Sequence, residues 1–162
     1  MRTTRNLLFG CLLMGCGPLA AQDCKMVFDA MTKVIDTPTH AFVTMNMEGA
    51  SHTAESIYVG GLVYANFGGK WSPGTSTQDL KTLAEKNRRD NKTSCRFLKD
   101  ESVGGETAAV YSVHEVSPQA TSDSKIWISK AKGLPLRSDL EMDGGKNRIS
   151  TRYEYGNVKP PV

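Results

Sequence analysis

Paired glycines divide this chain into short segments in which apolar and polar residues alternate. The clearest pair is Gly60-Gly61, which separates Thr53–Val59 from Leu62–Phe67. A tight hairpin turn needs positive φ angles, which glycine adopts without strain, and a period of two is typical of a half-buried strand. The pattern therefore predicts antiparallel hairpins. Further pairs follow similar segments, at Gly68-Gly69, Gly104-Gly105 and Gly144-Gly145.

The alternating segments predict seven or eight strands in one mostly antiparallel sheet, because the connections between them are short. Thr107–Val116 is apolar at most positions, which is typical of a central strand that is buried on both faces. The other segments with this pattern are Ala41–Glu48, Cys95–Val103, Lys125–Lys130, Leu136–Met142 and Asn147–Tyr155.

Two segments have the period of an amphipathic helix. In Asp23–Ile35 the apolar residues recur every three or four positions, and Pro38 ends the pattern. Thr75 or Ser76 can cap a second helix, which carries Asp79 in its first turn. The apolar residues of the two helices are Met26, Val27, Ala30, Met31 and Val34, followed by Leu80, Leu83 and Ala84.

A large antiparallel sheet twists and curls, so we expect an α+β fold in which a curved half-barrel is covered by two helices. Space left beneath the helices would form a pocket for an apolar ligand. Ordinary core packing explains inward-facing apolar residues equally well, so both interpretations stay open. The candidates for lining the pocket are Val43, Met45, Met47, Trp71 and Trp127.

The first 21 residues are typical of a secretory signal peptide. Arg2 and Arg5 precede a short apolar run, which is followed by small residues up to Ala21. Cleavage after Ala21 would leave residues 22–162 as one soluble periplasmic domain. Alternatively, Leu13–Cys16 is similar to a lipobox, and acylation of Cys16 would anchor the protein in the outer membrane.

Charge gives little support for nucleic-acid binding. The net charge of +3 falls to about +1 without the two leader arginines. One basic cluster remains, at Lys86, Arg88, Arg89 and Lys92, and Asp90 interrupts it. We therefore expect no nucleic-acid partner.

Of the four cysteines, Cys24 and Cys95 lie beyond the leader. An even number of cysteines in an exported chain favours a disulfide, here closing a loop of about 70 residues. A redox or metal site would need a CxxC pair or clustered ligands, and the three histidines are scattered along the sequence. We expect a structural disulfide and neither a metal nor another cofactor.

No catalytic motif stands out in the sequence. His114 and Glu115 are neighbours on a strand and point to opposite faces. Ser112 and His114 share a face, but the serine is not in a Gly-x-Ser-x-Gly motif, and the sequence assigns no acidic partner. A non-catalytic protein is the expectation.

Two segments carry a resemblance to a known family. Lys125–Arg137, with a tryptophan strand and a Gly-Leu-Pro bend, and Tyr153–Val158 resemble the periplasmic carriers of outer-membrane lipoproteins (LolA/LolB-like) and their wider superfamily of half-barrels. The similarity covers about residues 24 to 159. It implies a curved sheet with a helical lid that binds acyl chains in a hydrophobic cavity.

Two functional hypotheses follow. The first is a periplasmic protein that binds lipid or an acylated protein, with peripheral contact to the outer membrane. The alternative is an envelope interaction module with a filled core, in which exposed aromatic residues such as Tyr58, Tyr64 and Trp71 bind a protein.

Overall fold

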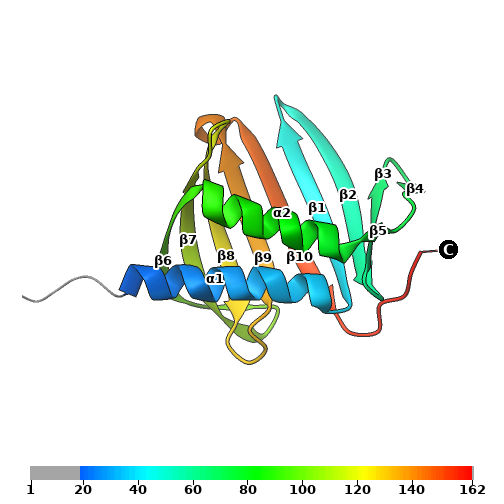
Figure 1. Ribbon diagram of the computed structural model, residues 1–162, viewed down its shortest axis with the longest axis horizontal. Coiled ribbons are helices and arrows are strands. Elements are labelled where there is room, and N and C mark those ends of the chain that lie inside the picture. The colour runs from blue at the N-terminus through cyan, green and yellow to red at the C-terminus, as the bar shows by residue number, and fades with distance from the viewer. Residues whose placement is uncertain (1–18, 162) are drawn as a thin grey trace, which may run out of the picture.

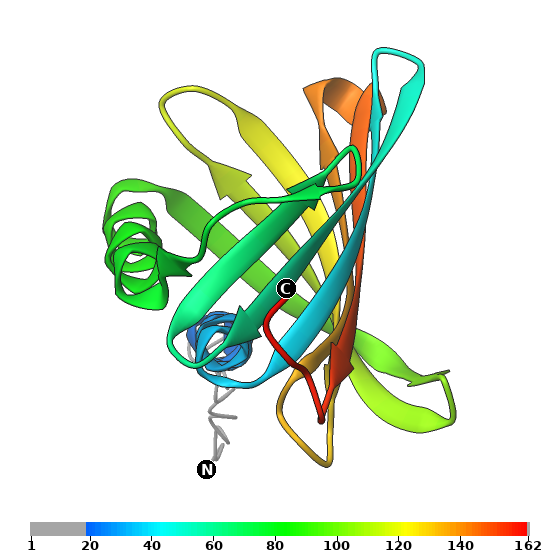
Figure 2. The ribbon, with the colours of Figure 1, turned by 90° about the vertical axis from the view of Figure 1, so that its right-hand side faces the viewer.

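The computed structural model describes residues 19–161, which form one long antiparallel sheet and two helices on one of its faces (Figures 1 and 2). The helices are α1 (Leu19–Asp36) and α2 (Thr77–Asp90), and a short 3-10 helix spans Asp143–Gly145. The strands are β1 (Thr39–Met47), β2 (Ala50–Val59), β3 (Leu62–Phe67), β4 (Lys70–Trp71), β5 (Thr75–Ser76), β6 (Lys92–Val103), β7 (Glu106–Val116), β8 (Thr121–Ser129), β9 (Pro135–Met142) and β10 (Asn147–Tyr155).

The sheet is open and curved. Its strand order is β4-β3-β2-β1-β10-β9-β8-β7-β6, with β5 paired to β3. The α+β half-barrel with two covering helices is therefore confirmed. Eight strands match the expected segments, and β4 and β5 are additional. With two residues each, they are too short to show a period in the sequence.

The apolar composition of β7 suggested a strand in the centre of the sheet. In the structure, β7 lies next to the edge strand β6. It is apolar on both faces because it contributes to two separate cores. Tyr111 and Val113 pack against α1 on the face that we call inner. Ala108 and Val110 form a smaller cluster on the opposite, outer face.

Helix α1 is attached to the sheet by one row of side chains, Val27, Ala30 and Val34, all of which are buried. Met26, which the sequence grouped with this row, is 46% exposed. The helix also begins at Leu19, four residues before the expected start. Most of the expected signal peptide, with Cys16, lies outside the described residues, so the leader and the route of processing stay predictions.

A disulfide joins Cys24 of α1 to Cys95 of β6, with a Cα–Cα distance of 5.0 Å. The expected pairing is therefore confirmed. Next to it, the Asp23 carboxylate accepts a hydrogen bond of 3.0 Å from the backbone N–H of Phe97 on the sheet edge. The start of α1 is thus fixed to β6 by a covalent bond and a polar contact.

Candidate functional site: a cavity beneath two helices

A cavity of about 700 Å³ lies between α1, α2 and the inner face of the sheet. This volume is within the range of sites for small apolar ligands. Two tyrosines on the sheet, Tyr58 of β2 and Tyr153 of β10, contribute to its lining. The apolar lining residues on the two helices are Phe28, Met31, Val34, Ile35, Leu80 and Ala84.

Helix α1 faces the cavity with a second apolar row, Phe28, Met31 and Ile35, which is rotated from the row that packs on the sheet. All three are half-buried. Two adjacent rows with the same helical spacing give α1 a wide apolar surface, of which the sheet covers only part. Sequence reasoning recognised Met31 and missed Phe28 and Ile35, although their spacing of three and four residues was a usable signal.

Helix α2 covers the cavity but is hardly buried. Its only buried residue is Thr77, and Leu83 is 53% exposed. Leu80 and Ala84 line the cavity with a few other α2 residues, but neither is buried by the protein. The apolar side of α2 therefore has no tightly packed partner within residues 19–161.

The two ends of α2 are fixed by hydrogen bonds. The backbone N–H and the hydroxyl of Thr77 both donate to the Gly61 carbonyl, at 3.0 and 3.1 Å. Ser76 is the N-cap, as the sequence allowed, and accepts from the Gln78 N–H at 3.2 Å. Directly after the helix, the Asn91 side-chain amide donates to Glu115 at 3.0 Å. The helix is thus a strap anchored at its ends.

Equal numbers of basic and acidic residues surround the cavity. The basic residues are Lys33, Lys81 and Arg88, and the acidic ones are Asp29, Asp36 and Glu85. Several already have partners: Lys81 lies 2.5 Å from Asp36, and the Arg88 guanidinium lies 5.2 Å from the centre of the Phe28 ring. The rim is therefore close to electrically neutral and joins α2 to α1.

Three residues that the sequence suggested for the lining of the pocket are Val43, Met45 and Met47. They lie on the inner face of the sheet but farther along β1 than the residues that line this cavity. Val43 pairs with Thr151 and Met45 with Ile149, whereas the cavity tyrosines lie beside the first residues of β1. Val43 and Met45 are half-buried and Met47 is 36% exposed. They form an apolar continuation of the inner face beyond the residues that line the cavity.

Trp127 lies on the outer face. Its neighbours Ile126 and Ile128 pack in the inner core with α1, so the tryptophan between them points the other way. It packs against Ala108 and Val110 and is 8% exposed. The alternation was visible in the sequence, but nothing local showed which set of residues faces the helices.

Trp71 also lies on the outer face. Its ring centroid is 6.4 Å from that of His40, whose neighbours Thr39 and Ala41 share the face of the cavity tyrosines. Trp71 and Trp127 are therefore separated from the cavity by the sheet itself.

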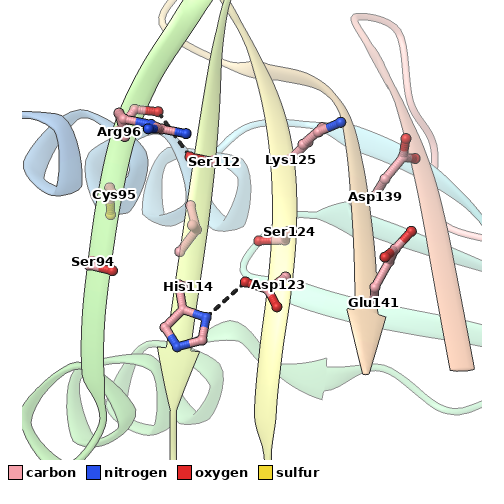
Figure 3. A pocket seen from close by; sticks show the side chains of 11 residues that line it. Ser94, Cys95, Arg96, Ser112, His114, Asp123, Ser124, Lys125, Asp139 and Glu141 are labelled. Carbon is pink, nitrogen blue, oxygen red and sulfur yellow. Dashed lines mark hydrogen bonds and ion pairs between the residues drawn. The ribbon is translucent and has the colours of Figure 1, made fainter. Parts of the chain in front are cut away.

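A second depression, of about 590 Å³, lies over strands β6 to β9 and is lined mainly by polar side chains (Figure 3). His114 Nδ1 lies 2.8 Å from Asp123 Oδ1, the acidic neighbour that the sequence did not assign. The Ser112 hydroxyl donates to the Arg96 carbonyl at 3.4 Å, and the imidazole of His114 points away from it (Figure 3). The arrangement gives Ser112 no general base.

Within residues 19–161, no three or more histidine, cysteine or acidic side chains come together in a way that could hold a metal ion. No helix among the same residues has both the length and the apolar character needed to cross a membrane.

Comparison with solved structures identifies the architecture. The lipoprotein LppX of Mycobacterium tuberculosis superposes with a TM-score of 0.53 at 11% sequence identity, over 86% of this chain and 98% of LppX. This chain has the LppX fold. MucB superposes with a TM-score of 0.52 at 14% identity, over 89% of this chain and 62% of MucB.

The LppX-like fold confirms the expected likeness to lipoprotein carriers as a likeness of architecture. No protein-family model matches the sequence, and the comparison with curated proteins found no match. At sequence identities of 11% and 14%, the similarity to these two proteins shows a common fold and nothing more. The chain spans less than two thirds of MucB. What the cavity of this chain holds must therefore be argued from its own residues.

Proposed function

We propose that this protein is a non-catalytic binding protein of the bacterial envelope that holds the acyl chains of a lipid or an acylated protein between α1, α2 and the sheet. The observation that carries the proposal is the unburied apolar side of α2 above a cavity of about 700 Å³. An amphipathic helix normally buries its apolar side, so an apolar ligand would supply the missing partner.

The neutral rim supports the same proposal. Since the surrounding acidic and basic side chains balance, attraction by net charge would add little to binding. The apolar surface between the helices would supply most of the free energy of binding, with about 0.8 kcal/mol for each buried methylene. A periplasmic location and contact with the outer membrane remain part of this proposal and depend on the predicted leader.

Partly filling the cavity should weaken binding without unfolding the protein. We expect Ala84→Trp to weaken the binding of the uncharged fluorophore N-phenylnaphthylamine at least about ten-fold, because the indole would occupy space otherwise open to the ligand. Fluorescence titration would measure the affinity, and native mass spectrometry of the wild-type protein would test for co-purified lipid.

Thr82→Trp is the matched control for this variant. Thr82 is exposed on the same helix and does not line the cavity, so the added indole should leave the affinity unchanged. Wild-type protein that neither retains lipid nor binds the probe would contradict the proposed function.

A further inference from the structure

The two tyrosines that line the cavity differ in their hydrogen bonds. The Tyr153 hydroxyl lies 3.3 Å from the Ser138 hydroxyl and shares a hydrogen bond with it. Tyr58 lines the same cavity, yet its hydroxyl makes no hydrogen bond to any residue within 19–161. The hydroxyl is also not among the fully enclosed polar atoms that lack a partner, so part of its surface stays accessible.

The Tyr58 hydroxyl is a neutral donor. Burial raises the pKa of Tyr58 above its usual value, and the nearby Tyr153 raises it further. The phenol therefore keeps its proton throughout the physiological range. A phenol in a largely apolar site binds most favourably to a group that accepts this hydrogen bond, because an unpaired buried hydroxyl is unfavourable.

The surroundings favour a neutral acceptor over a carboxylate. The cations around the cavity have other contacts: Lys81 pairs with Asp36, and Lys33 donates to the Lys132 carbonyl at 2.6 Å. Arg88 stacks on Phe28. Only the Lys81–Asp36 contact is an ion pair, but a carboxylate buried beside Tyr58 would lose its hydration, which costs far more than the burial of a neutral carbonyl.

We infer that the Tyr58 hydroxyl donates a hydrogen bond to the carbonyl oxygen that joins an acyl chain to the rest of the ligand. This inference rests on the proposed function and narrows its ligand class to fatty-acyl esters or amides, in preference to plain hydrocarbons and free fatty acids. Tyr58 then determines specificity, while the helices supply the apolar contact.

Two probes of equal length test this inference. Methyl laurate carries an ester carbonyl where dodecyl methyl ether carries a methylene group. Both can be titrated as competitors of N-phenylnaphthylamine, an uncharged fluorophore. We expect the wild-type protein to bind the ester about five-fold more tightly than the ether, the effect of one hydrogen bond. In Tyr58→Phe the two probes should bind equally, at the affinity of the ether.

Tyr64→Phe is the matched control and should retain the preference for the ester, because Tyr64 pairs with Ile57, on the face of the sheet opposite to Tyr58, and does not line the cavity. Unchanged binding of the ether to Tyr58→Phe would show that this variant folds. A preference that persists in Tyr58→Phe would overturn the inference and leave the proposed function intact. If neither probe displaces the fluorophore from wild-type protein, both are overturned.

Discussion

Loss of the Cys24–Cys95 disulfide should lower the free energy of unfolding by about 4 kcal/mol, because the bond closes a long loop in the unfolded chain. The paired residues are 71 positions apart. A change of this size corresponds to a fall of about 10 °C in the melting temperature of a domain of this length. Thermal unfolding followed by circular dichroism, with and without dithiothreitol, would measure it.

The double variant Cys24→Ser, Cys95→Ser is the control for effects of the reductant. It should melt at the temperature of the reduced wild-type protein, and dithiothreitol should not change it. Reduction exposes no large cavity, since Val27, Ala30 and Val34 still attach α1 to the sheet. Equal melting temperatures for oxidised and reduced wild-type protein would contradict the predicted contribution.

Trp127→Ala should destabilise the protein by about 3–5 kcal/mol, the usual range for the truncation of a buried tryptophan. The indole is 8% exposed and packs against Ala108 and Val110. The Arg137 guanidinium lies 4.9 Å from its ring centre and adds a cation–π contact. Urea unfolding followed by circular dichroism would measure the loss.

The same variant also tests whether Trp127 contributes to ligand binding in the cavity or only to stability on the outer face. Because the indole lies on the outer face, the folded Trp127→Ala protein should bind N-phenylnaphthylamine as the wild type does. Trp71→Ala, at a half-buried position near the sheet edge, should change stability by less than about 1 kcal/mol. Weakened binding with unchanged stability in Trp127→Ala would place the indole in the cavity instead.

Local signals in the sequence were sufficient for most of the secondary structure. The segments Leu62–Phe67 and Asn147–Tyr155 coincide with β3 and β10. The turn at Gly60-Gly61 has φ angles of 62° and 77°, as a tight hairpin requires. These features depend on neighbouring residues only, which is why a period of two and a pair of glycines predicted them.

Features that depend on distant residues were not predictable in this way. No local pattern indicates that β1 pairs with β10, because residues such as Ala41 and Tyr153 meet only in the folded sheet. The same limit applies to the site. Tyr58 was considered only as part of a protein-binding surface, since its place beneath two helices depends on how α1 and α2 lie across the sheet.

The pairing of β1 with β10 has a consequence for how the molecule can form. Strands β1 to β3 and strands β6 to β9 are two groups of neighbours in sequence, and β10 lies between them. Until this late segment is available, no strand pairs with both groups. Such contacts between distant parts of a chain form slowly. An exported protein of this topology would therefore complete its sheet only after nearly the whole polypeptide has crossed, with the apolar inner surface open to chaperones until then.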